Sequence, residues 1–120
     1  MSEGDLRRDV DGLFGRFFAD KGFKETGYFH DPAAFGNEFL RMTGPRHMKL
    51  EFTRDRGFIS LSVLKGSLAR RFVDVRRLLK ELDTDDRHYG TFEDSGMQPA
   101  LVQDVKLRWE ELIKRAASAK

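Results

Sequence analysis

The sequence predicts an α+β fold of two layers, in which one N-terminal and two C-terminal helices pack on one face of a four-stranded antiparallel meander (order α-β-β-β-β-α-α). Apolar residues recur at helical spacing near both ends of the chain, whereas in the middle they alternate with polar residues. A length of 120 residues is typical of one domain, so a single domain is expected over residues 1–120.

The first helix is expected over residues 5–21 and is followed directly by Gly22, which can adopt the left-handed conformation that ends a helix. Within this stretch, Gly15 is interpreted as a point where another element approaches closely. The apolar stripe of this helix consists of Leu6, Val10, Leu13, Phe14, Phe17 and Phe18.

Four strands are expected over residues 23–30, 37–43, 47–54 and 58–64, and the last two alternate most regularly. Their apolar face carries Met48, Leu50, Phe52, Ile59, Leu61 and Val63. Their opposite face carries Lys49, Glu51, Thr53, Phe58, Ser60 and Ser62. We expect helices to cover the apolar face and solvent to reach the other.

The connection between these two strands fits a three-residue hairpin loop, Asp55-Arg56-Gly57, with the glycine in the left-handed position. The turn explains Asp55 and Gly57, but it requires no arginine. Arg54 and Arg56 are therefore predicted as binding residues, together with Phe58, which begins the next strand.

Helical spacing returns from Phe72 onward, where Asp74 is a plausible N-cap. The stripe of this second helix consists of Val75, Leu78, Leu79 and Leu82. A polar loop is expected over residues 83–96. Pro99, which is tolerated in a first helical turn, then opens a last helix that runs to about Ala116.

Composition restricts the classes of function. The chain has no cysteine, which excludes disulfides, thiolate nucleophiles and iron–sulfur clusters. Its 22 basic and 20 acidic residues nearly balance, which argues against general coating of nucleic acid. No apolar run approaches the roughly 20 residues that span a bilayer, and the N-terminus has no apolar signal core, so no membrane contact and a cytoplasmic location are expected.

The polar loop holds carboxylates at alternate positions, as calcium-binding loops do. It departs from that pattern because His88 stands where glycine is needed and Asp94 stands where a bidentate glutamate is needed. No metal is therefore expected, and Asp83, Asp85 and Asp86 are predicted to bind as an acidic surface.

An RNA-binding or single-stranded nucleic-acid-binding sheet is the first alternative, because Arg56-Gly57-Phe58 matches the opening of the RNA-recognition-motif signature. The match ends there, since Ser60 and Ser62 stand where sheet aromatics would be expected. A small-molecule-binding domain or an enzyme is the second alternative. No serine lies in a nucleophile elbow and no glycine-rich phosphate loop is present, so neither catalysis nor a cofactor is predicted.

Charge is segregated along the chain. Residues 41–56 and residues 70–82 each hold five basic and two acidic residues, whereas residues 83–96 hold five acidic residues and one arginine. Such segregation can steer a charged protein partner. The polar sheet face, with Phe58, Leu64 and Phe39, could supply the contact, because interfaces use aromatic anchors inside a polar rim.

The layout resembles small bacterial proteins of the immunity type that accompany polymorphic toxins. The resemblance covers residues 10–82 and rests on GFK (residues 22–24), TRDRGFISLSV (residues 53–63) and FVDVRRLLKEL (residues 72–82). It implies stoichiometric binding of a toxin without catalytic residues. We therefore expect a non-catalytic protein-binding module, immunity-type or regulatory, whose partner and oligomeric state the sequence does not identify.

Overall fold

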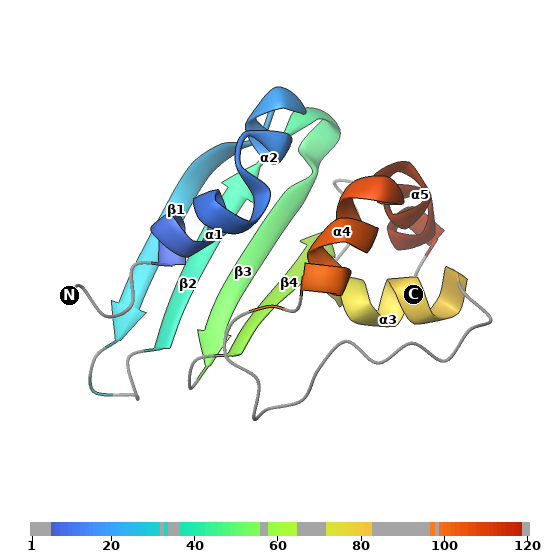
Figure 1. Cartoon of the computed structure of the whole chain (residues 1–120). Helices are drawn as coiled ribbons and strands as arrows, with labels where there is room; N and C mark the ends of the chain where they lie inside the picture. The colour runs from blue at the N-terminus through green and yellow to red at the C-terminus, as the bar shows by residue number, and fades with distance from the viewer. Residues whose placement is uncertain are drawn as a thin grey trace.

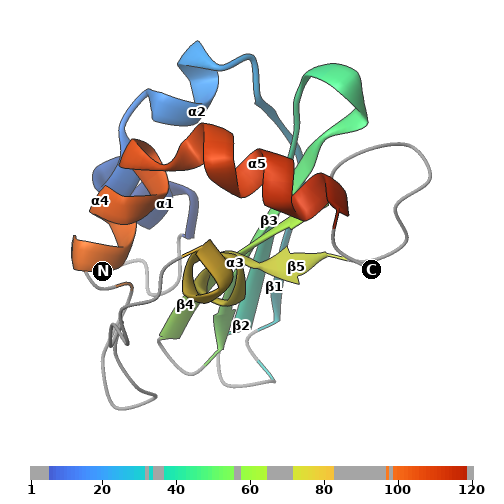
Figure 2. The same cartoon turned by 90° about the vertical axis from the view of Figure 1, so that its right-hand side faces the viewer.

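A five-stranded antiparallel sheet bears helices on one of its faces, which confirms the predicted fold class (Figures 1 and 2). The computed structural model describes residues 6–31, 33, 37–55, 58–64, 72–82, 97 and 99–118. The strands are β1 (Lys24–Asp31), β2 (Asn37–Thr43), β3 (Lys49–Asp55), β4 (Phe58–Leu64) and β5 (Val73–Asp74), and they pair in chain order. The helices are α1 (Leu6–Phe14), α2 (Phe17–Asp20), α3 (Val75–Leu82), α4 (Pro99–Leu107) and α5 (Trp109–Ser118).

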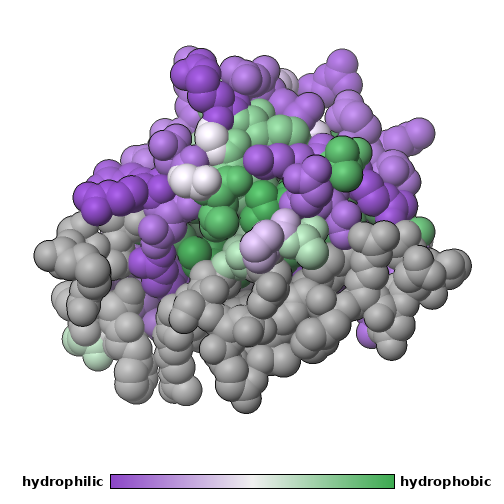
Figure 3. Space-filling model, in the orientation of Figure 1, coloured by the Kyte–Doolittle hydropathy of each residue, from purple (hydrophilic) through white to green (hydrophobic). Residues whose placement is uncertain are grey.

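The alternation predicted for β3 and β4 decides which face of the sheet is covered. All six residues of the predicted apolar face are buried, with Leu50, Phe52 and Leu61 fully inaccessible to solvent. Helix α1 lies against β2 and β3, whereas α3 and α5 lie against β4. On this side of the molecule, apolar side chains lie in the middle, with polar side chains above them and at their sides (Figure 3).

Aromatic rings fill the centre of the core. The ring centroid of Phe18 lies 4.9 Å from that of Phe14, 5.2 Å from that of Trp109 and 5.8 Å from that of Phe52. All three contacts are tilted or edge-to-face, which suits the charge distribution of aromatic rings. The core therefore joins α2, β3 and α5 through one cluster, and this accounts for several of the eleven phenylalanines.

The N-terminal helix is two helices rather than one. Gly15 adopts a positive φ of 56°, which breaks the regular helix between α1 and α2. A Cβ at Gly15 would meet nothing within 4 Å, so the interpretation of this glycine as a point of close approach is wrong. Gly22 has a φ of 89° and ends α2 as predicted.

The sheet has one strand more than predicted. Val73 and Asp74 pair with β4 before α3 begins at Val75, within a stretch that the sequence pattern assigned to the helix. Asp74 also caps α3, since its Oδ1 accepts a hydrogen bond from the backbone N–H of Arg76 at 2.8 Å. Burial raises the pKa of the Asp74 carboxyl, and the bond to Arg76 counteracts that effect.

Two further predictions need small corrections. The last helix is divided at Arg108 into α4 and α5, although Arg108 and Leu112 both donate backbone hydrogen bonds four residues back and keep the two pieces nearly continuous. The antiparallel pairing of β3 with β4 is confirmed, but Asp55 still pairs with Phe58. Two residues rather than three therefore connect the strands. The left-handed conformation predicted for Gly57 lies outside the described residues.

Candidate interaction surface on the open face of the sheet

Two neighbouring residues of strand β2, Glu38 and Phe39, reverse the usual distribution of polar and apolar side chains. The burial of β2 alternates, with Glu38 and Leu40 toward the helices and Phe39 and Arg41 toward the opposite, open face. Glu38 is fully buried, whereas 42% of the Phe39 surface is exposed. Because a buried carboxylate and an exposed phenylalanine both oppose folding preferences, each needs a reason of its own.

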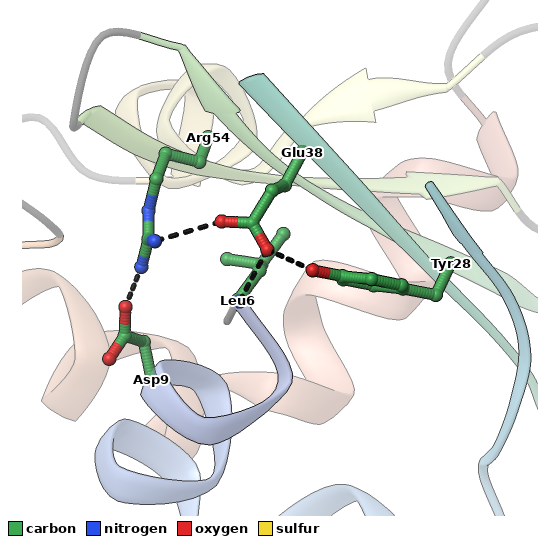
Figure 4. Close-up of polar contacts among 5 residues, drawn as sticks. All are labelled: Leu6, Asp9, Tyr28, Glu38 and Arg54. Carbon is green, nitrogen blue, oxygen red and sulfur yellow. Dashed lines mark hydrogen bonds and ion pairs between the residues drawn. The ribbon is translucent and has the colours of Figure 1, made fainter. Parts of the chain in front are cut away.

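The reason for Glu38 is a set of hydrogen bonds at the start of α1 (Figure 4). Its Oε2 accepts from the backbone N–H of Leu6 at 2.7 Å and from the hydroxyl of Tyr28. Its Oε1 accepts from Nη1 of Arg54 at 2.9 Å. Arg54 also forms an ion pair with Asp9 of α1.

These contacts fasten α1 to the sheet. The first N–H groups of a helix have no partner within the helix. Here the Glu38 carboxylate from β2 accepts a hydrogen bond from one of them, and its negative charge is stabilised by the positive end of the helix dipole. Arg54 balances the buried charge and is itself only 14% exposed in its side chain. Arg54 thus has a structural role that the hairpin argument did not assign to it.

The remaining predicted binding residues stay predictions. Arg56, Asp83, Asp85 and Asp86 lie outside the described residues. Phe58 is the first residue of β4 and pairs with Asp55, but its side chain is also outside the described part.

Phe39 has an aromatic neighbour on the open face, and this pair bears on why Phe39 is exposed. Phe39 is directly opposite Phe29 in the β1–β2 ladder, and the two ring centroids are 6.2 Å apart with planes tilted by 37°. Phe29 is 57% exposed. The sequence pattern indicates Phe39 as part of a contact surface but indicates no role for Phe29, because the alternation of β1 is interrupted.

A shallow depression of about 450 Å³ lies beside the two rings. It is lined by Thr26, Gly27, Tyr28, Phe29, Phe39, Arg41 and Glu51. The guanidinium of Arg41 is held in place, with Nη2 2.6 Å from Oε2 of Glu51 and the ring of Phe72 at 5.1 Å. The depression therefore presents aromatic surface on one side and a fixed, charge-balanced polar pair on another.

Much of the rest of the open face is polar, although Leu64 lies opposite Lys49 on it. Thr26 and Thr43 hydroxyls lie 3.0 Å apart, and those of Thr53 and Ser60 lie 2.7 Å apart. Beyond them, Lys24 and Lys49 flank Thr43 in register, so two ammonium-bearing side chains share one end of this face. The two exposed phenylalanines are thus surrounded by hydroxyl and charged groups.

We name the open-face patch by its members: Phe29, Phe39, Gly27, Arg41, Glu51 and Lys24. Among the residues that the structure describes, no three histidine or acidic side chains come together in a way that could hold a metal ion. In the same part of the chain, no helix is long and apolar enough to cross a membrane.

No protein-family model, no curated protein and no solved structure matches this chain.

Proposed function

We propose that this protein is a non-catalytic protein-binding module that uses the open-face patch, in an immunity-type or regulatory role. The observation that supports the proposal most is the exposed aromatic pair, Phe29 and Phe39, on a face that the helices leave open. Exposed aromatic pairs of this kind oppose solubility and are typical of surfaces that a partner covers.

Fully burying one exposed phenylalanine side chain stabilises by about 1.5–3 kcal/mol. Phe29 and Phe39 are 57% and 42% exposed, so the two rings together supply about the equivalent of one such anchor toward a binding free energy. Arg41 and Glu51 pair with each other and hydroxyl groups surround the rings, as in interfaces where aromatic residues at the centre have a polar rim.

Single-stranded nucleic acid is the second candidate, because two adjacent exposed rings on a sheet also offer a stacking surface. The charges on the same face favour protein. Arg41 is neutralised by Glu51, and a backbone-tracking groove would need a continuous excess of Lys and Arg. A fluorescent oligouridylate that binds with steep salt dependence, and fails to bind a Phe29→Ser variant, would replace the protein proposal with this one.

Photo-crosslinking from inside the patch tests the proposed function. A benzoylphenylalanine in place of Phe39, in cells that express the chain naturally, is expected to give a discrete protein adduct that weakens when Phe29→Ser is added. The control places the same crosslinker at Leu107, which is 71% exposed in α4 on the helix-bearing side.

Three outcomes would contradict the proposal. These are the absence of an adduct from position 39, the same adduct from position 107, and an adduct that ribonuclease removes.

A further inference from the structure

Strand β1 lies at the outer edge of the sheet, next to the open-face patch. It pairs with β2 on one side, and no described strand lies beyond it on the other (Figure 1). Eight residues long, it is a far more extensive edge than β5, which has two residues. Edge strands of this length are templates onto which another chain can pair its backbone.

A bulge limits where such pairing can occur. The β1–β2 register shifts between Glu25 and Gly27, whereas residues 27–31 pair regularly with β2. Bulges and charged residues are devices that blunt an edge. Here the bulge and two charged residues, Lys24 and Glu25, lie in the first part of β1, whereas the regular part has one charged residue, Asp31, at its end. The regular part, residues 27–31, spans about 17 Å at roughly 3.3 Å per residue.

Gly27 begins this regular part, and neither its backbone nor its neighbours require a glycine. It is not among the positive-φ residues, and a Cβ built on it would lie 3.8 Å from the Cβ of Arg41, an ordinary contact distance. Glycine in a strand often marks a bulge, and the β1–β2 bulge ends at Gly27; it also marks sites where another chain or ligand approaches closely. The missing side chain is what leaves the depression open between Thr26 and Phe29.

We propose that an extended segment of the partner protein adds to β1 along residues 27–31 and places a large apolar or aromatic side chain over Gly27. In this arrangement the partner residues opposite Gly27 and Phe29 point to the open face, because alternate residues of paired strands share a face. An aromatic side chain on a neighbouring strand is known to cover an edge glycine favourably. Phe29 and Phe39 then pack against that side chain.

The charges beside the patch define the partner segment further. Lys24 and Lys49 lie on the open face beyond the bulge, and the exposed Arg46 lies in the turn between β2 and β3. A chain that continues past Gly27 in this direction meets Lys24, whereas Lys49 lies two strands farther into the sheet and acts over a longer distance. We therefore expect acidic residues on that side of the apolar anchor. The inferred partner class is thus an acidic extended segment with one aromatic or large apolar anchor.

This inference rests on the proposed function, and its test uses a different probe. A phage-displayed library of random linear peptides is selected on the full-length wild-type chain, and the enriched peptides are synthesised. We expect a shared aromatic residue flanked by Asp or Glu. We also expect the dissociation constant to rise at least about tenfold for Gly27→Val, which fills the depression, and for Lys24→Glu.

The control is Ser62→Val, which places the same valine side chain on the open face of β4, where half-buried Ser62 pairs with Asp74. This variant is expected to bind as the wild type does. Amide exchange in the peptide complex is expected to slow in residues 27–31 and to stay unchanged in α4. Thermal unfolding of each variant verifies that it is folded.

The peptide experiment can refute strand addition without refuting the proposed function, which photo-crosslinking tests. If no peptide is enriched, if Gly27→Val binds the peptides as tightly as the wild type, or if exchange slows only in helices, strand addition is refuted. An adduct from position 39 would still stand in that case, and the partner would then bind the open face in another way.

Discussion

Glu38 lies on the covered face of β2 with three hydrogen-bond donors around its carboxylate, and α1 begins at one of them. Glu38→Ala would leave the Leu6 N–H and the Arg54 guanidinium without this partner in a buried setting. We expect the free energy of unfolding to fall by about 3–5 kcal/mol, as for other broken buried ion pairs. Chemical denaturation monitored by circular dichroism measures it.

Glu51→Ala is the matched control on the neighbouring strand, since Glu51 pairs with the half-exposed Arg41 on the open face. Its loss should lower the free energy of unfolding by about 1 kcal/mol or less, because solvent screens such pairs. Equal effects of the two substitutions would show that the Glu38 contacts do not hold α1 in place.

At the open face, Phe29→Ser and Phe39→Ser should be tolerated by the isolated chain. Their rings are 57% and 42% exposed, and a cross-strand pair contributes only about 0.2–1 kcal/mol. Phe52→Ala, at a fully buried ring in the core, should lower the free energy of unfolding by about 3–5 kcal/mol instead. If the open-face variants unfolded as readily as Phe52→Ala, the rings would be structural and the patch would lose its main support.

Individual residues show where sequence reasoning succeeded and failed. The alternation of β3 and β4 predicted correctly which side chains are buried. The same alternation places Arg54 on the face of Phe52, so its inward position was predictable from parity, although its partners Glu38 and Asp9 come from distant segments. Glu38 itself was missed because burial of a carboxylate depends on three donors that only the folded chain brings together.

The left-handed backbone conformation of Gly15 separates α1 from α2. Alanine substitutions at Gly15 and at Gly12 test directly whether this break depends on glycine. Gly15→Ala should destabilise the fold by about 1–2 kcal/mol, because its φ of 56° is strained for a residue with a Cβ. Gly12→Ala, in the interior of α1 with open space around it, should stabilise by about 1 kcal/mol. Thermal unfolding compares the two, and a stabilising Gly15→Ala would mean that the α1–α2 break does not depend on glycine.

Glu81 links α3 to α5 and makes their association sensitive to acid. Its carboxylate accepts from Nε of Arg115 at 2.7 Å and from Nε of Arg77 at 3.2 Å. The hydrogen bond from Arg115 and then that from Arg77 lower the pKa of Glu81 below its ordinary value. A lowered folded pKa means that this stabilisation is complete above about pH 4.3 and is lost as the pH falls through the folded pKa.

The corresponding variant is Glu81→Gln, which has no charge to lose. Below about pH 4.3 its stability should decline less steeply with falling pH than that of the wild type. Urea unfolding at a series of acidic pH values measures the two slopes. Parallel slopes would show that the Glu81 pair does not contribute to the acid sensitivity.

Strand and helix positions were largely predictable, whereas their ends and interruptions were not. The order of elements and the bounds of β2 and β4 follow from periodicity alone. The split at Gly15 and the two-residue β5 depend on a left-handed backbone and on pairing with β4, which hydrophobic spacing does not encode. β1 was the least regular strand, and its bulge concealed the outward position of Phe29.

For the whole molecule, one face of the sheet carries helices and the other carries the open-face patch. Segregated charge, an extended edge strand and two exposed phenylalanines all fit a chain that works by contact with another protein. A toxin as the partner stays a prediction. The patch, rather than the hairpin arginines, is now the first surface to test.

Footprinting with hydroxyl radicals, in cells and on the purified chain, tests the central claim most directly. Oxidation of each phenylalanine and leucine is read by mass spectrometry. The account predicts that Phe29 and Phe39 react in the purified protein and become protected in cells, while the more exposed Leu107 reacts equally in both. Equal oxidation of Phe29 and Phe39 in the two samples would contradict the claim that a partner covers the open face.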